Sequence, residues 1–129
     1  MEIVVIEDDS IYAEFVCKSL AQPGRTIHHF PDAESALIFL SNKNPEVLII
    51  DYKLPGMSGI DFFLKIKDKI RLSSNTKAIM MSALDDGRMV LNFIQKGVRD
   101  YVIKDEYVIE SLNAILEGRE EEMMFFGTY

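Results

Sequence analysis

The amino-acid sequence predicts an α/β fold in which strand and helix units alternate around a parallel sheet. Short β-branched runs alternate five times with amphipathic stretches of helical spacing. One run, VLII at 47–50, is apolar at every position, which is typical of a central strand covered on both faces. The length of 129 residues corresponds to one domain of ordinary size. We therefore expect a single α/β domain.

The expected elements are short and lie between Pro and Gly positions. The five candidate strands are 2–6, 26–30, 47–50, 77–81 and 99–103. Each is followed by a stretch with an apolar stripe, and a residue that can cap a helix precedes each stretch. These expected caps are Ser10, Asp32, Ser58, Asp85 or Asp86, and Asp105.

The composition excludes several classes of function. Asp and Glu number 21 against 14 Lys and Arg, a formal charge of −7, which argues against binding through nucleic-acid phosphates. The single Cys17 cannot form an internal disulfide, which fits a reducing compartment. The acidic start MEIVVIEDDS is unlike a secretory signal, and no apolar run approaches the roughly 20 residues of a membrane span. We expect a cytoplasmic protein without direct contact to nucleic acid or membrane.

Polar and charged residues stand at the carboxyl ends of four candidate strands. In an open α/β sheet, ligands bind beyond these ends. Clustered carboxylates repel each other and are tolerated where a hard cation such as Mg²⁺ binds among them. A hydroxyl and an ammonium nearby suit a phosphoryl group, and a carboxylate can be its nucleophile. The residues concerned are Glu7, Asp8 and Asp9, then Asp51, Ser82 and Lys104.

Any one of these residues has an ordinary structural explanation. An acidic residue at a strand end often complements the dipole of the next helix, and a lone lysine is usually solvated. Their occurrence together at successive strand ends favours a shared site instead. The set indicates Mg²⁺-assisted phosphoryl transfer onto an aspartate.

The segments VVIEDD, IIDYKLPGMSG, AIMMSA and GVRDYVIKD resemble the response-regulator receiver domain of two-component signalling. This resemblance covers nearly the whole chain. It implies a flavodoxin-like, doubly wound, five-stranded parallel sheet of order 2-1-3-4-5 with five helices on both faces. It also implies a receiver domain over residues 1–120, followed by a tail at 121–129 whose role is unknown.

The resemblance assigns roles to the residues at the strand ends. Asp51 matches the phosphoacceptor, and Ser82 and Lys104 match the groups that bind the phosphoryl oxygens. For Mg²⁺ it implies Asp8 and Asp51 as direct ligands, with Glu7 acting through water. The main-chain carbonyl of Lys53 matches the remaining protein ligand, and Asp9 falls outside this set.

Other positions match residues that control the phosphorylated state. Tyr101 and Ser82 match a pair that moves when the acceptor is phosphorylated, and so changes the face made by the fourth helix, fifth strand and fifth helix. Lys53 and Leu84 match the positions that gate water attack, and their side chains predict slow self-dephosphorylation. The family usually has proline where Asp105 stands. We therefore expect a trans peptide there, with the Asp105 carboxylate capping a following amide.

The resemblance implies a signalling domain rather than an enzyme, although phosphorylation by small phosphodonors is expected. Its partner would be a histidine kinase or a histidine phosphotransfer protein, and the downstream partner or fused output domain is left open. The face named above could also join two copies of the chain. One alternative is a degenerate receiver that binds partners without phosphorylation. Another is a haloacid-dehalogenase-type phosphohydrolase, which needs an acidic residue where Lys53 stands.

Overall fold

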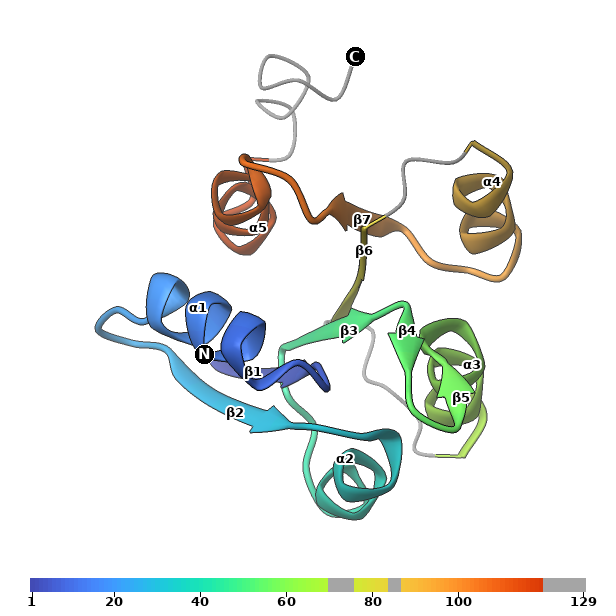
Figure 1. Cartoon of the computed structure of the whole chain (residues 1–129). Coiled ribbons are helices and arrows are strands. Elements are labelled where there is room, and N and C mark those ends of the chain that lie inside the picture. The colour runs from blue at the N-terminus through green and yellow to red at the C-terminus, as the bar shows by residue number, and fades with distance from the viewer. Residues whose placement is uncertain (70–75, 84–86, 120–129) are drawn as a thin grey trace.

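Five parallel strands form one sheet in the computed structural model, which describes residues 1–69, 76–83 and 87–119 (Figure 1). The strand order is β2-β1-β3-β6-β7, which is the expected order 2-1-3-4-5 when the sheet strands are numbered along the chain. The strands are β1 (Glu2–Ile6), β2 (Thr26–Phe30), β3 (Val47–Asp51), β6 (Lys77–Ser82) and β7 (Asp100–Ile103).

Helices cover both faces of the sheet, as expected (Figure 1). One face carries α1 (Ser10–Leu20) and α5 (Val108–Leu116). The other carries α2 (Ala33–Leu40), α3 (Gly59–Lys69) and α4 (Gly87–Gln95). Among the residues described, none of the helices has the length and apolar character needed to cross a membrane.

The two cores follow from the alternation of side chains along each strand. The central strand β3 is buried at all five positions, because helices cover both of its faces. The core beneath α1 and α5 takes one set of alternate residues, Ile3, Val5, Val47, Ile49, Ile79, Met81 and Val102. The core beneath α2, α3 and α4 takes the intervening set, Val4, Ile6, Leu48, Ile50 and Met80. Alternation therefore decides which face each residue at a strand end approaches.

Two of the expected helix caps, at α2 and α3, are confirmed, and the one expected at α1 is wrong. The Asp32 carboxylate accepts from the amide of Ser35, and the Ser58 hydroxyl accepts from the amide of Asp61. At α1 the cap is Asp9, which accepts from two amides, and Ser10 is the first helical residue. A carboxylate is a good acceptor for the exposed amides of a first helical turn, so the residue one position earlier takes this role. The expected cap at Asp85 or Asp86 lies outside the described residues.

The segment before α5 follows the expectation in part. The Asp105 carboxylate accepts from the Tyr107 amide at 2.9 Å, as expected. Asp105 is nevertheless not the helix cap that was expected, because the helix begins only at Val108 and its N-cap is Tyr107, which makes no side-chain cap hydrogen bond. The described part of the chain contains no cis peptide bond, so the Lys104–Asp105 bond is trans, as expected from the absence of proline.

A small antiparallel hairpin between β3 and α3 was not expected from the sequence. It pairs β4 (Lys53–Leu54) with β5 (Met57–Ser58). Pro55 and Gly56 form its turn, in which Gly56 has a φ of 80°, a conformation that favours glycine. The hairpin carries Lys53 at the edge of the sheet where the site residues were expected.

Candidate functional site

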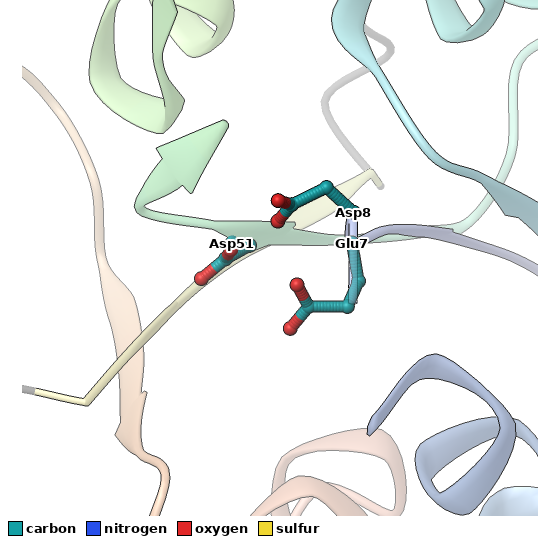
Figure 2. Close-up of side chains that lie close together, drawn as sticks. All are labelled: Glu7, Asp8 and Asp51. Carbon is teal, nitrogen blue, oxygen red and sulfur yellow. The ribbon is translucent and has the colours of Figure 1, made fainter. Parts of the chain in front are cut away.

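Three carboxylates meet at the carboxyl edge of the sheet, as the strand-end residues predict. One oxygen from each of Glu7, Asp8 and Asp51 lies within 4.8 Å of the other two. Glu7 and Asp8 follow β1, while Asp51 ends the neighbouring strand β3. Figure 2 shows Glu7 and Asp8 projecting to opposite sides of the end of β1, with Asp51 beside them. An oxygen-only donor set of this kind fits Mg²⁺.

Asp51 is held by close packing of the main chain. Its side chain is buried, and its partner across the sheet is Met81 in β6. The amide of Gly59 donates to the carbonyl of Tyr52 at 2.6 Å, which draws the start of α3 against the end of β3. A Cβ atom at Gly59 would lie 2.3 Å from the main-chain oxygen of Asp51. Only glycine fits this close approach.

Lys104 joins two of the three carboxylates. Its Nζ lies 2.6 Å from Glu7 Oε1 and 3.0 Å from Asp51 Oδ1. Burial alone lowers the pKa of Lys104, but the hydrogen bonds to Glu7 and Asp51 outweigh that effect and raise it overall. The ammonium therefore stays charged where it lies beside Asp51.

Glu7 has an unusual environment for a carboxylate. Its side chain is fully buried, and burial raises its pKa to about 7, against the opposing effect of the hydrogen bond from Lys104. The negative charge of Asp51 nearby also raises this pKa. The carboxylate cluster thus carries an electrostatic cost that a bound cation would relieve.

Ser82 and Tyr101 approach the opposite face of the sheet. Ser82 ends β6 and is buried, with its hydroxyl 4.0 Å from the sulfur of Met89 in α4. Tyr101 on β7 is half-buried and packs against the core beneath α2, α3 and α4. The expected moving pair therefore lies on the face covered by α4, whereas the ion pair of Lys104 and Glu7 lies beside α1.

An open cavity of about 250 Å³ gives access to the cluster. Its lining includes Glu7, Asp8, Asp51, Lys53, Ser82 and Lys104. The structure thus brings together every described residue that was expected to hold Mg²⁺ or a phosphoryl group. Lys53 is exposed and is one of the residues that line this cavity. Leu84, the other expected gating residue, lies outside the described residues.

One residue near the site was missed by sequence analysis. The ammonium of Lys104 lies 4.7 Å from the centroid of the Tyr12 ring, in α1. Tyr12 belongs to the apolar stripe of its helix, and this pattern indicates only a core residue. Its place in the first turn after the acidic run was the one signal that could have connected it with the site.

The comparisons with known proteins agree with this geometry. The family model of the response regulator receiver domain matches residues 3–117, so the chain belongs to that family. The chain is 28% identical over 119 residues to the two-component response regulator PhoP of Pseudomonas aeruginosa, covering 90% of this chain and 52% of PhoP. It therefore spans about half the length of that relative.

Solved structures show the same fold. The Francisella response regulator 1452 receiver domain matches with a TM-score of 0.79 at 25% identity, covering 95% of this chain and 98% of that one. The BeF3-activated receiver domain of DrrB, from Thermotoga maritima, matches with a TM-score of 0.77 at 29% identity, covering 93% and 97%. The chain is a signalling domain of the two-component type.

Proposed function

We propose that this receiver domain accepts a phosphoryl group on Asp51 and thereby changes a surface that binds a partner. The observation that carries the proposal is the position of the Asp51 carboxylate. It lies beside a cavity, 3.0 Å from the ammonium of Lys104 and within 4.8 Å of two further carboxylates. This arrangement provides a nucleophile, a cation for the phosphoryl oxygens and an oxygen-rich site for Mg²⁺.

The proposed reaction is an in-line transfer. A carboxylate oxygen of Asp51 attacks the phosphorus atom of a phosphorylated imidazole, so a P–O bond forms as the P–N bond breaks. The electron pair of the broken bond remains on the departing imidazole nitrogen. Lys104 Nζ and Ser82 Oγ bind the transferred oxygens. Asp8, Asp51, the Lys53 carbonyl and Glu7 through water would hold Mg²⁺, which neutralises phosphoryl charge when bound.

The proposed response to phosphorylation passes from Ser82 to α4. The Ser82 hydroxyl is 4.0 Å from the sulfur of Met89, a weak acceptor that a charged phosphoryl oxygen would outcompete. Movement of Ser82 toward Asp51 would open space on the face where Tyr101 is half-buried. The surface that changes is then formed by α4, β7 and α5. A BeF3-bound structure in which Ser82 and Tyr101 have not moved would contradict this path.

The proposed partner upstream is a histidine kinase or a histidine phosphotransfer protein in the cytosol. Relatives such as PhoP support a two-component pathway, and their greater length supports an output domain in the full regulators. We propose residues 1–120 as the receiver unit, since the family match spans 3–117. The tail at 121–129 lies outside the described residues, and assembly of two chains through the α4, β7 and α5 face remains a proposal.

We also propose that the phosphorylated form loses its phosphate slowly. Lys53 is exposed and lines the cavity, so its cation could pair with the phosphoryl group and hinder the approach of water. Leu84 lies outside the described residues, and its proposed role follows from its position in the sequence. Replacing both residues with small polar ones should accelerate the decay of labelled phosphate.

The test is phosphorylation by acetyl phosphate with Mg²⁺, followed by intact-mass measurement. The wild-type chain should gain one phosphoryl group, and Asp51→Asn should gain none. Asp68→Asn is the matched control, because it makes the same chemical change on the exposed side of α3 and should leave the reaction unchanged.

Two outcomes would contradict the proposal. Equal phosphate incorporation in Asp51→Asn would show that another residue is the acceptor. A folded wild-type chain that gains no phosphate would favour the alternative of a receiver that binds partners without phosphorylation. The hydrolase alternative has less support, because Lys53 offers no carboxylate where that mechanism needs an acid or base.

A further inference from the structure

Tyr12 is placed against the site by contacts on two sides. Its amide donates to the Asp9 carboxylate at 3.1 Å, so the cap of α1 fixes the first turn that carries the ring. Its ring lies 5.8 Å, centroid to centroid, from that of Phe15 on the next turn of the helix. The ring therefore has a defined position before any ligand binds.

The face of this ring meets the Lys104 ammonium. The distance of 4.7 Å from Nζ to the centroid lies within the range of cation–π attraction, which extends to about 6 Å. The Lys104 side chain is only 17% exposed, so little water weakens the attraction. The ammonium is thus held by two carboxylates and one aromatic face.

The hydroxyl of Tyr12 has a different situation from its ring. The oxygen is buried and has no hydrogen-bond partner among the residues described. Burial raises the pKa of this hydroxyl, so it remains neutral. Since the hydroxyl makes no bond, the contribution of Tyr12 to the site comes from the ring.

We propose that Tyr12 is a positioning residue whose ring face holds the Lys104 ammonium beside Asp51 for phosphoryl transfer; this inference rests on the proposed function. During the transfer, Lys104 must turn one donor from a carboxylate oxygen of Asp51 to a phosphoryl oxygen. A hydrogen bond would resist that rotation because it is directional. A ring face attracts the ammonium through its charge distribution and permits the rotation while the distance is kept.

The sharpest test changes the ring's electron density without changing its shape. Position 12 is filled with phenylalanine and then with phenylalanines of increasing fluorination, and the rate of phosphate incorporation from acetyl phosphate is measured. Tyr12→Phe should stay within about twofold of wild type, because an unbonded hydroxyl is lost. Full fluorination should slow the reaction about fivefold, because it removes the ring's attraction for the cation. Partly fluorinated rings should give intermediate rates.

The same fluorinated residues at position 39 provide the matched control. Phe39 lies on α2 at the other face of the sheet, where its ring contacts Phe30, so its fluorination should leave the rate unchanged. A flat series at position 12 in a chain that still accepts phosphate would overturn the inference and leave the proposed function standing. A wild-type chain that accepts no phosphate would instead overturn the proposed function.

A second readout needs no phosphorylation. In the NMR spectrum, the ε-methylene protons of Lys104 should be shifted upfield by the ring current of Tyr12. Tyr12→Phe should keep that shift, whereas Tyr12→Leu should abolish it. Absence of the shift in the wild-type chain would contradict the placement of the ammonium over the ring.

Discussion

The parallel strands begin at one end of the sheet, here called the amino edge, and finish at the other, the carboxyl edge. Both edges carry buried or half-buried cations, but these cations have different partners. At the amino edge, the Arg25 guanidinium donates to the Leu20 carbonyl at 2.9 Å and to Asn113 Oδ1 at 2.8 Å. Lys77 Nζ donates to the Ile115 carbonyl at 3.1 Å. These carbonyls belong to the last turns of α1 and α5, where helices leave acceptors unsatisfied. The cations at this edge donate mainly to helix carbonyls, although Arg25 also pairs with the Glu117 carboxylate at 3.7 Å.

At the carboxyl edge, the cation pairs with carboxylates instead of helix carbonyls. Lys104 meets two carboxylates directly, and Asp8 adds a third to the same cluster. The described residues of this cluster thus carry more carboxylates than cations. The comparison teaches that charge alone does not mark a functional edge. A functional edge is indicated by more carboxylates than the local cations can pair with, because such carboxylates can bind a further cation. Cations bound to main-chain carbonyls indicate a structural edge.

The largest loss of stability is expected from a substitution at Gly59, where the main chain packs closely at the carboxyl edge. In Gly59→Ala, the new Cβ would lie 2.3 Å from the Asp51 main-chain oxygen and 3.0 Å from Tyr52 Cα. The backbone must shift, so the free energy of unfolding should fall by about 3 kcal/mol. Urea unfolding measures this. Gly87→Ala is the control, since its Cβ meets nothing within 4 Å; equal stability of the two variants would refute the packing argument.

A substitution at the amino edge should lower stability without lowering the rate of phosphorylation. Arg25 is 5% exposed at its side chain, and Arg25→Ala leaves the Leu20 carbonyl and Asn113 without their partner. We expect the free energy of unfolding to fall by about 2 kcal/mol. Arg119→Ala, at a half-exposed arginine, should change it by less than about 0.5 kcal/mol.

The comparison of the two edges then depends on the phosphorylation rate of folded Arg25→Ala. A rate within about twofold of wild type is expected, because this variant changes no group at the carboxyl edge. Loss of phosphate incorporation in a folded chain would show that the amino edge also serves the reaction, and the distinction between the edges would fail.

The dependence of stability on pH should also differ between the two edges, because of Glu7 at the carboxyl edge. Its pKa is about 7 in the folded chain and near the ordinary 4.5 when unfolded, so the folded state binds more protons between these values. Stability of the metal-free chain should therefore fall as pH rises from about 4.5 to about 7. Glu7→Gln lacks this loss and should be more stable than wild type at pH 8, by about 2 kcal/mol.

The advantage of Glu7→Gln should disappear toward pH 5, where wild-type Glu7 is protonated in the folded chain. Glu46→Gln is the control at the amino edge, where the carboxylate is exposed and pairs with the N-terminal ammonium at 3.7 Å. It should change stability by less than about 0.5 kcal/mol. Parallel pH profiles for wild type and Glu7→Gln would contradict the burial of an ionised carboxylate.

Much of the fold was predictable because β3 is apolar throughout and the helical stripes are regular. The hairpin of β4 and β5 was not, because strands of two residues have no periodicity. Its only signal is Pro55–Gly56, and such a pair indicates a break between elements as readily as a hairpin turn. At α1, Asp9 and Ser10 can both cap a helix, so their order along the chain did not decide between them.

The site was predictable to the extent that parallel strands end at one edge. That rule places Asp51, Ser82 and Lys104 near the acidic residues after β1. It does not give the pairing of Lys104 with Glu7, which depends on the alternation of faces beyond the strand ends. Tyr12 was missed for a related reason. Its helical spacing is that of a core residue, and only the folded chain brings its ring to the ammonium.

The smallest effect concerns the excess of carboxylates itself. If the carboxyl edge holds Mg²⁺ with a Kd on the order of 1 mM, 10 mM MgCl2 should raise the free energy of unfolding by about 1.4 kcal/mol. Asp8→Asn should lose most of this gain, because Asp8 belongs to the carboxylate cluster. Asp8 is exposed, so its replacement should cost little stability without Mg²⁺.

Asp9→Asn is the matched control for Asp8→Asn. It removes a neighbouring carboxylate from the cavity lining while asparagine can still cap α1. If the gain came from general screening of negative charge, both variants would lose it equally. If Mg²⁺ is bound by the cluster, Asp9→Asn keeps the gain and Asp8→Asn loses it, as thermal unfolding with and without MgCl2 would show. Equal loss in both variants would show that Mg²⁺ only screens the negative charge of the carboxyl edge. The difference between the two edges would then give no evidence for a Mg²⁺ site.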